Sequence, residues 1–425
     1  MNTPPASTTR RRFLKNSAAA GIAATAFPSS LTAAEQKRVA GANDRIRIGQ
    51  IGCGSRGVGT HMNSIYRHVE ATNFEIVAIA DPNRIAREKA SSKAKEWFGR
   101  EPKSFVSAGD LLALDDVDAV MIASPDHHHS AHLEAAANAG KHIYIEKPMA
   151  IEMEPLVRSV DAARKAGTII QVGTQLRSLP SIRGAREYFQ SGILGRVSRI
   201  DEIRNSPKPY WLQYLNPEIQ KADVEWKEFI GDRPHRPFRA DVYSAWYGYY
   251  EFSQGPVPQW GAHYLDMIQF IADLGFPESC VCHGGAFAPK DDHEFTAPDQ
   301  IQATWVYPGN IVVTSANNLQ HGAGSVRAIY GDRGVLNVQN WNRPVATANG
   351  APQRDGSIRG EVEIEHIDGP DHWLDWLLCM RSGRQPNAPI ESGFQHSVAT
   401  VMAQRSYETG RRTLYNAETR TIELA

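Results

Sequence analysis

The stretch Ile48-Gly49-Gln50-Ile51-Gly52-Cys53-Gly54-Ser55-Arg56-Gly57 decides the fold of the first half of the chain. An apolar run leads into a Gly-x-Gly-x-x-Gly turn, the pattern that joins a strand to a helix in a dinucleotide site. Gly52 permits the tight turn, Gly54 lets the backbone approach a pyrophosphate, and Gly57 lets the helix pack against the strand. The N-terminus of that helix then faces phosphate. The turn residues predicted to contact a cofactor are Gly52, Gly54, Ser55, Arg56 and Gly57.

An acidic residue follows at the distance that a dinucleotide requires. Phe74 to Ala80 is predicted to be a second buried strand, and it ends at Asp81, 24 residues after Gly57. An acid about 20 residues after the glycines accepts hydrogen bonds from the ribose 2′-hydroxyl. Its charge repels a 2′-phosphate, whereas Arg84, three residues on, works in the opposite direction. The sequence therefore predicts NAD, with NADP as the less favoured cofactor.

Around these residues, short apolar runs alternate with amphipathic segments, which is the pattern of a parallel sheet wound by helices. The predicted strands are Ile46 to Ile51, Phe74 to Ala80, Val117 to Ala123, His142 to Ile145 and Thr168 to Val172. The predicted helices are Ile85 to Phe98, Ala131 to Ala139 and Pro155 to Ala166. We therefore predict an α/β Rossmann domain over residues 45–172.

The pattern changes after Gly173. Residues 205–255 are rich in Pro, Trp and Tyr and show little periodicity, and a long irregular insertion of this kind is usually functional or a lid. Helices are expected at Ala262 to Leu274 and about Phe394 to Thr409. Strands at meander spacing are expected at Ser279 to Phe287, Gln300 to Tyr307, Asn310 to Ala316, Ser325 to Tyr330 and Gly334 to Val338. We predict a substrate-binding α+β domain over residues 173–425, with an open, mainly antiparallel sheet.

The N-terminal stretch indicates export. Thr9-Arg10-Arg11-Arg12-Phe13-Leu14-Lys15 matches the twin-arginine pattern, and the Ala-rich run from Ala18 to Phe27 is too short to span a bilayer. We assign residues 1–34 to a signal peptide, with cleavage at Ala24-Thr25-Ala26 or Thr32-Ala33-Ala34. The alternative is a disordered basic tail. The expected location is the periplasm, or another compartment reached by the twin-arginine route, without stable membrane insertion.

Length and charge narrow the class of partner. A chain of 425 residues is expected to form about two domains. Its formal net charge of −1 provides no electrostatic footprint for nucleic acid or an anionic membrane, so a small molecule is the expected partner. The four cysteines form no Cys-x-x-Cys pair, which disfavours a zinc site built on them.

Three further segments give the chain a family resemblance. They are Ser124-Pro125-Asp126-His127-His128-His129, Glu146-Lys147-Pro148 and Gly261-Ala262-His263-Tyr264-Leu265-Asp266. Together with the glycine turn and Asp81, they resemble the Gfo/Idh/MocA oxidoreductases, over essentially the whole mature chain. The resemblance implies an NAD(P)-dependent oxidoreductase acting on CH-OH groups. It also implies that Lys147 projects toward the nicotinamide and that His263 completes the catalytic site. The residues that it places near the cofactor are Ser124, His129 and Glu146.

The chemistry agrees with those two roles. Oxidising an alcohol requires a base that removes the hydroxyl proton as hydride leaves for the nicotinamide. His263 can be that base, and the Lys147 ammonium can hold the oxygen and offset its developing charge. Lys147 follows the carboxyl end of a predicted strand, where doubly wound sheets bind their ligands. The sequence leaves open how the two residues share the work.

Other polar residues are candidates for substrate binding. Asp266 lies one turn after His263, where it orients the imidazole, binds a sugar hydroxyl or is simply a solvated helix acid. Members of the family commonly carry an aspartate at the position of Gln259, and an amide cannot hold charge, so His263 is expected to be a weaker base. The predicted substrate contacts are Lys147, Arg177, Gln259, His263 and Asp266.

Histidines and aromatic residues allow alternative interpretations. His128 and His132 stand four apart at the start of a helix, but zinc requires an assembled set of three or four ligands, and no metal site is predicted. The aromatic residues of the insertion form either a platform for sugar rings or part of the core or a subunit interface. They are Tyr210, Trp211, Trp226, Trp246, Tyr247, Tyr249 and Tyr250.

We therefore predict an exported, homo-oligomeric, NAD-dependent oxidoreductase acting on a sugar or polyol hydroxyl. Because the twin-arginine route carries folded proteins and no free nicotinamide pool is expected outside, the cofactor is expected to stay bound and to be recycled within the catalytic cycle. One rival is a glycoside-cleaving enzyme that oxidises, eliminates and re-reduces its sugar. Another is a non-catalytic sugar-binding protein, against which Lys147 and His263 argue.

Overall fold

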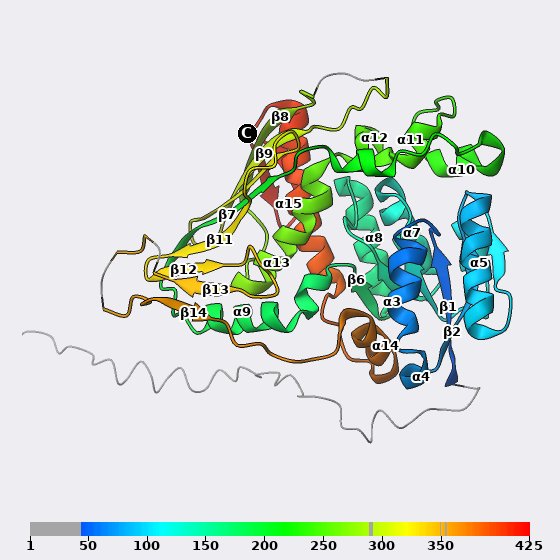
Figure 1. Ribbon diagram of the computed structural model, residues 1–425, viewed down its shortest axis with the longest axis horizontal. Coiled ribbons are helices and arrows are strands. Elements are labelled where there is room, and N and C mark those ends of the chain that lie inside the picture. The colour runs from blue at the N-terminus through cyan, green and yellow to red at the C-terminus, as the bar shows by residue number, and fades with distance from the viewer. Residues whose placement is uncertain (1–43, 289–291, 349, 353–354) are drawn as a thin grey trace, which may run out of the picture.

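The protein contains two sheets that stand side by side, with helices between them and around the first (Figure 1). The computed structural model describes residues 44–288, 292–348, 350–352 and 355–425. The predicted signal peptide, residues 1–34, lies outside the described residues. Within them, no helix is both long and apolar enough to cross a membrane.

The first sheet has six parallel strands in the order β3-β2-β1-β4-β5-β6, as a Rossmann domain requires. Its strands are β1 (Ile46–Ile51), β2 (Phe74–Ala80), β3 (Lys103–Phe105), β4 (Ala119–Ile122), β5 (His142–Ile145) and β6 (Ile170–Val172). Every residue of β2 is buried because helices cover both faces of the sheet, which explains its unbroken apolar run. Strand β3 was not predicted, because Lys103 and Ser104 are exposed at the sheet edge and give no apolar signal.

The helices around this sheet begin and end at recognisable residues. Asn83 caps α5, since its side chain accepts a hydrogen bond from the Ala86 N–H at 3.1 Å, and Gly99 ends that helix with φ +71°. The helices are η3 (Gly57–Met62), α3 (Asn63–Tyr66), α4 (Val69–Thr72), α5 (Arg84–Phe98), α6 (Ala108–Leu112), α7 (Asp126–Asn138) and α8 (Met153–Ala166). Helix α7 starts earlier than predicted, so the histidine run is helical.

The second sheet has ten strands in the order β14-β13-β12-β11-β7-β10-β9-β8-β15-β16, and among the described pairs only β7 with β10 is parallel. The prediction of a mainly antiparallel sheet is therefore confirmed. Its strands are β7 (Val197–Asn205), β8 (Ser279–Gly285), β9 (Gln300–Tyr307), β10 (Ile311–Asn318), β11 (Val326–Gly331), β12 (Gly334–Asn337), β13 (Val345–Thr347), β14 (Glu361–Glu363), β15 (Thr413–Asn416) and β16 (Thr421–Leu424).

Strand β7 lies near the middle of this sheet but was not predicted. Two consecutive residues of this strand, Asp201 and Glu202, are acidic and buried, and they break the apolar alternation that marks a strand. Each has a cationic partner, because Arg199 lies 2.7 Å from Asp201 and Arg327 lies 3.4 Å from Glu202. Paired acids of this kind are tolerated in a core.

Three long helices lie between the two sheets, and Figure 1 shows α13 and α15 crossing there. They are α9 (Pro180–Gln190), α13 (Ala262–Ala272) and α15 (Ile390–Thr409). The short helices of the insertion, residues 205–255, run above the helices of the first domain, over α8 and α7 and toward α5 (Figure 1). These are η5 (Tyr210–Tyr214), η6 (Lys221–Asp223), α10 (Trp226–Ile230), α11 (Ala240–Ser244), η7 (Trp246–Gly248) and α12 (Tyr250–Ser253).

One helix from the C-terminal part of the chain, α14 (His372–Ser382), packs against the first domain. Trp373 stacks on Tyr144 of β5 with ring centroids 4.0 Å apart. Trp373, Trp376 and Leu377 share one buried cluster with Ile48 and Phe74 of the Rossmann sheet. The core on this side of the sheet is therefore completed by residues that lie far along the chain.

Candidate active site

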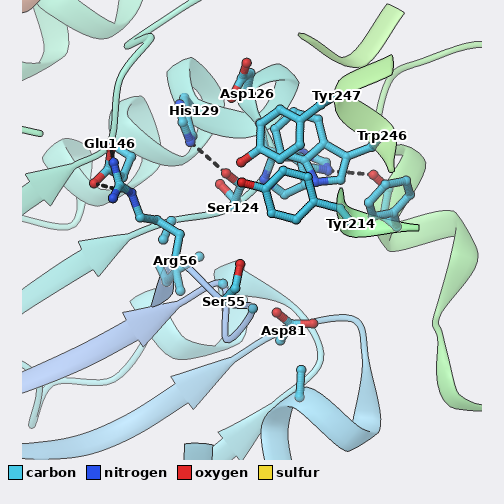
Figure 2. Close-up of a pocket in the computed structure, with 18 of the residues that line it drawn as sticks. Ser55, Arg56, Asp81, Ser124, Asp126, His129, Glu146, Tyr214, Trp246 and Tyr247 are labelled. Carbon is cyan, nitrogen blue, oxygen red and sulfur yellow. Dashed lines mark hydrogen bonds and ion pairs between the residues drawn. The ribbon is translucent and has the colours of Figure 1, made fainter. Parts of the chain in front are cut away.

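A cavity of about 890 Å³ lies at the carboxyl ends of β1, β2, β4 and β5. The first domain forms one wall, and the insertion, β7 and the start of α13 form the other. Figure 2 shows Ser55, Arg56 and Asp81 on the first wall and Tyr214, Trp246 and Tyr247 opposite them. This is the crevice in which a doubly wound sheet binds its cofactor, and the volume is within the usual range for ligand pockets.

The glycine turn has the geometry that its spacing predicts. Gly52 has φ +82°, a conformation that favours glycine. A Cβ on Gly57 would stand 1.9 Å from the Gly52 carbonyl oxygen, so no larger residue fits there. A Cβ on Gly54 would meet no atom within 4 Å, and Gly54 lines the cavity. The turn therefore leaves open space where a pyrophosphate would lie against the backbone.

Asp81 stands at the end of β2 with its carboxylate buried. Its oxygens accept hydrogen bonds from the backbone N–H groups of Cys53 at 2.6 Å and Asn83 at 2.7 Å. Burial raises the pKa of Asp81, and these two donors oppose that rise. Arg84 is held by Glu88 and Asp223, each at 2.6 Å, and so is already neutralised by protein carboxylates.

We expect the protein to bind NAD more tightly than NADP, and Asp81→Ser to narrow that preference. The serine removes the charge that repels a 2′-phosphate and one acceptor for the ribose hydroxyl. Titration of both cofactors against both proteins measures the ratio. Tighter binding of NADP by the unaltered protein would contradict this assignment. Arg84→Ala is the matched control, expected to leave the ratio almost unchanged because Arg84 is already paired.

Glu146 is the centre of a buried ionic network beside the glycine turn. Its carboxylate receives Arg56 Nε and His61 Nε2, both at 3.0 Å, and Gln175 Nε2 at 3.2 Å. Burial opposes ionisation, but the Arg56 charge and the His61 hydrogen bond together hold the pKa of Glu146 well below its ordinary value. The ionised carboxylate fixes Arg56 against the wall of the cavity, and Glu146 is followed directly in the chain by Lys147.

Lys147 points its ammonium across the cavity to the second domain. Its Nζ donates to the Gln259 backbone carbonyl at 2.7 Å and lies 3.4 Å from the Gln259 side-chain oxygen. The Gln259 amide in turn donates to the Asp126 carboxylate. Burial lowers the pKa of Lys147 to about 8, although the Asp126 charge acts in the opposite direction. Gln259 is therefore a neutral connection between a buried ammonium and a buried carboxylate.

Asp126 is a site residue that the sequence reasoning missed. It lines the cavity at the first turn of α7, and burial raises its pKa well above the ordinary value. A signal was present, because Asp126 lies within the segment Ser124 to His129 that carries part of the family resemblance. The site thus contains a carboxylate, but it comes from α7 of the first domain and not from position 259 of the second.

His263 projects into the same cavity from the first turn of α13. It follows a π-helical turn, η8 (Val257–Gly261), and such turns are frequent at functional sites. Within the described part of the chain its Nδ1 has no hydrogen-bond partner. Burial, with the nearby Lys147 charge, lowers the pKa of His263 well below its ordinary value. The shift favours the neutral imidazole, the form with a nitrogen lone pair for a proton, and makes it a weaker base.

Two predicted substrate contacts lie elsewhere. Arg177, in η4 (Gln175–Ser178), and Asp266 of α13 pair with each other at 2.7 Å and are not among the residues that line this cavity. His396 Nδ1 lies 3.4 Å from the other Asp266 oxygen. The pair holds α13, and with it His263, against the turn after β6. Substrate binding by these two residues stays a prediction.

The histidine run is occupied by protein contacts. His129 places its two ring nitrogens 2.7 Å from the carbonyls of Ser124 and Pro148, and burial lowers its pKa to about 4. His127 and His128 both contact the Phe229 carbonyl of the insertion, at 2.9 and 2.8 Å. Among residues whose positions are described, no group of three His, Cys, Asp or Glu side chains is arranged to hold a metal.

The aromatic residues of the insertion divide between the two predicted uses. Tyr210, Trp246 and Tyr247 line the cavity, joined by Tyr214 and Trp260, and Figure 2 shows the hydroxyls of Tyr214 and Tyr247 directed into it. Trp246 stacks on Tyr247 with centroids 3.8 Å apart. The others are packed away from the cavity, and they are Trp211, Trp226, Tyr249 and Tyr250.

The fold and site define an NAD-binding Rossmann protein with a second domain that closes the cofactor crevice. Residues 46–174 match the family model "Oxidoreductase family, NAD-binding Rossmann fold", and residues 229–337 match "GFO/IDH/MocA C-terminal domain". The two matches together span more than half of the chain. The chain belongs to the Gfo/Idh/MocA oxidoreductase family.

Individual relatives are more distant. Inositol 2-dehydrogenase 3 of Saccharopolyspora erythraea is 35% identical over 163 residues, which are 38% of this chain and 46% of that protein. Glycosyl hydrolase family 109 protein 2 of Shewanella sp. (strain ANA-3) is 35% identical over 171 residues, 36% of each chain. The matches thus span half or less of these relatives. The structure of aldose-aldose oxidoreductase from Caulobacter crescentus, complexed with glycerol, has the same fold with TM-score 0.64 and 17% identity, covering 87% of this chain and 99% of that one.

Proposed function

We propose that this protein is an exported NAD-dependent oxidoreductase that removes hydride from a hydroxyl of a sugar or polyol. The observation that carries the proposal is that Lys147 and His263 enter one cavity from opposite domains, beside an open glycine turn. Export is supported by the twin-arginine pattern at Thr9 to Lys15. The inositol dehydrogenase relative and the aromatic residues of the cavity support the carbohydrate class.

The residues present fit NAD. Gly54 leaves room for the pyrophosphate, and Asp81 stands where the adenosine ribose would lie. When bound, the nicotinamide supplies the hydride acceptor. Lys147 then holds the substrate oxygen with a charged hydrogen bond, and neutral His263 accepts the hydroxyl proton. The walls of Tyr214, Trp246 and Tyr247 exclude water from the reacting atoms.

The insertion is fastened to the first domain around the adenosine end. The Glu225 N–H donates to the Pro82 carbonyl at 3.0 Å, and Val224 forms a strand-like bridge with Asn83. On the other side, the Phe229 carbonyl receives His127 and His128. These contacts join the insertion to the first domain beside Asp81, and this attachment supports slow release of a dinucleotide.

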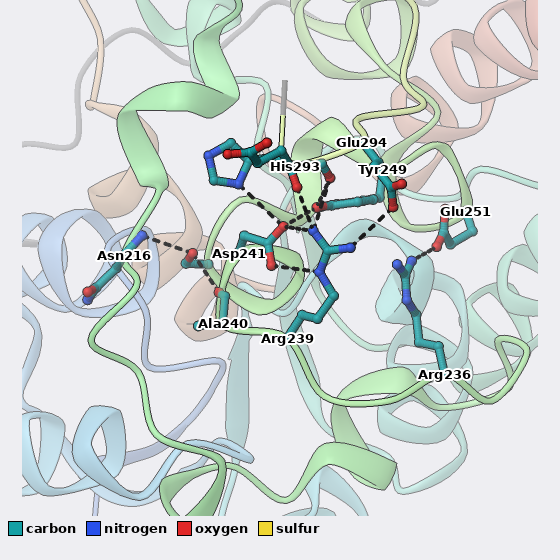
Figure 3. Close-up of polar contacts among 11 residues, drawn as sticks. Asn216, Arg236, Arg239, Ala240, Asp241, Tyr249, Glu251, His293 and Glu294 are labelled. Atoms are coloured by element: carbon teal, nitrogen blue, oxygen red, sulfur yellow. Dashed lines mark hydrogen bonds and ion pairs between the residues drawn. The ribbon is translucent and has the colours of Figure 1, made fainter. Parts of the chain in front are cut away.

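Hydrogen bonds and ion pairs within the insertion also connect its segments to one another (Figure 3). Arg239 donates to both oxygens of Asp241 at 3.1 and 2.7 Å, and the Tyr249 hydroxyl donates to Asp241 at 2.6 Å. The Asn216 N–H donates to Ser244 Oγ at 3.0 Å. An internally bonded insertion along one wall of the cavity supports a cofactor that stays bound from one turnover to the next.

We expect the exported form to retain NAD through extensive dialysis and to react with sugar without added cofactor. With the cofactor held in place, one sugar would supply the hydride, and a second sugar, or a later step on the same one, would take it back. Absorbance and mass of the dialysed protein measure retention. Complete loss of cofactor, with activity restored only as stoichiometric free NADH is produced, would refute it. His127→Ala, which removes one contact to the Phe229 carbonyl, is expected to speed release about tenfold.

Glycoside cleavage by oxidation, elimination and re-reduction is the second candidate. The family 109 relative and the uncharged Gln259 beside Lys147 favour it. The same dialysed protein distinguishes the two functions. Release of the aglycone from a nitrophenyl glycoside, without a second sugar and without net NADH, assigns the cleavage cycle. Homo-oligomer formation stays a prediction.

A further inference from the structure

Arg204 of β7 brings a positive charge to the second-domain wall of the cavity. Its guanidinium carbon lies 3.2 Å from the ring centroid of Trp260, a cavity residue. Among the described residues, no hydrogen bond or ion pair joins Arg204 to a carboxylate. Burial lowers its pKa to about 10, with the Glu202 charge acting against the decrease, so Arg204 remains charged at pH 7.

The acids near Arg204 are already engaged. Glu202, two residues earlier on the strand, receives the Ser315 hydroxyl at 3.0 Å and Arg327 Nε at 3.4 Å. Asp126 accepts from the Gln259 amide and faces Lys147. The other cation in this part of the cavity is Lys147 itself, whose pKa the Arg204 charge helps to lower. The substrate end of the cavity therefore carries more positive than negative charge.

A partly buried cation without an anionic partner is costly unless a ligand neutralises it. The guanidinium is planar and presents a fork of N–H donors that matches a carboxylate, and its stacking on Trp260 holds that plane in place. The glycine turn and Arg56 lie on the other wall, so the cofactor phosphates have a separate site (Figure 2). The charge of Arg204 is thus directed at the second ligand.

We propose that the substrate is an acidic sugar, whose carboxylate Arg204 binds while Lys147 and His263 act on a hydroxyl. This proposal rests on the proposed oxidoreductase function, and it names the class of substrate. Tyr210, whose ring lies 4.6 Å from that of Trp260, has a buried hydroxyl without a partner in the described structure and adds a polar group next to Arg204.

The test compares matched pairs of sugars that differ in a carboxylate: glucuronate with glucose, galacturonate with galactose, and mannuronate with mannose. Binding to the NAD-loaded protein is followed by tryptophan fluorescence, so turnover is not required. At least one uronate is expected to bind about 10- to 100-fold more tightly than its neutral partner, the range for a charged, bidentate hydrogen bond. Arg204→Gln is expected to abolish that difference without weakening the neutral sugar. Arg204→Lys keeps the charge without the fork and is expected to be intermediate.

Arg196→Gln is the control. Arg196 is exposed just before β7 and lies outside the cavity. Its substitution removes one positive charge, as Arg204→Gln does, from the other end of the same strand. It is expected to keep the preference for the uronate. The proposal is overturned if no uronate binds more tightly than its partner, including the case in which neither binds, or if Arg204→Gln weakens both equally. A tightly bound uronate that never reduces NAD would instead refute the oxidoreductase function, whereas turnover of neutral sugars alone would leave that function standing.

Discussion

Lys147→Ala is expected to lower turnover by roughly two to four orders of magnitude while NAD remains bound, the range for losing a positioned acid–base or oxyanion partner. Lys147 reaches across the cavity to the second domain, whereas the glycine turn and Asp81 that are expected to hold the dinucleotide lie in the first. Single-turnover reduction of the bound nicotinamide measures the chemical step. His263→Ala is expected to cause a similar loss.

The pH profile tests the role of the ammonium separately. The pKa of Lys147 is about 8, so a role as the charged hydrogen-bond donor requires turnover to fall as pH rises through that value. Asp126→Asn removes a charge that raises this pKa, and it is expected to move the fall to lower pH. Wild-type turnover in the Lys147→Ala protein with cofactor bound would show that the site is assigned wrongly.

Gly54→Ala and Gly57→Ala are expected to fail in different ways. The added methyl at Gly54 meets no protein atom within 4 Å but enters the space expected for the pyrophosphate, so stability is retained and NAD affinity falls about 10- to 100-fold. At Gly57 the methyl would overlap the Gly52 carbonyl oxygen, and the turn itself must move. A lower melting temperature is expected for Gly57→Ala alone.

Thermal unfolding and NAD titration of both variants separate these effects. Gly54→Ala with unchanged NAD affinity would show that the dinucleotide does not approach this backbone. The comparison needs no knowledge of the substrate, so it tests the cofactor site independently of the proposed reaction.

The parts of the fold that were predictable are those in which one strand supplies its own signal. The predicted bounds of β1, β2 and β9 agree with the structure, because burial on both faces or strict alternation marks them in the sequence. Strand β7 escaped prediction because its buried acids are stabilised by Arg199 and Arg327, a fact of tertiary packing.

The same distinction holds for the candidate site. Gly54, Asp81, Lys147 and His263 lie in short motifs, and all four line the cavity. Asp126 lies within a motif segment, but its contact with Gln259 forms only where the two domains meet. Arg204 lies in no motif, and its place in the cavity likewise depends on how the domains meet. For Arg177 and Asp266 the difficulty is the reverse, since opposite charges in a sequence can face a ligand or, as here, each other.

The packing of α14 against the Rossmann sheet determines when the first domain can be finished during synthesis. Residues 46–174 alone would leave Tyr144 without the tryptophan that stacks on it, and the buried cluster of Ile48 and Phe74 without its members from α14. An N-terminal domain usually folds while the ribosome is still making the later part of the chain. Here part of its core is supplied by α14, residues 372–382. We therefore expect that the nucleotide-binding domain cannot be exchanged between relatives as residues 46–174 alone. A chimaera must bring its own α14.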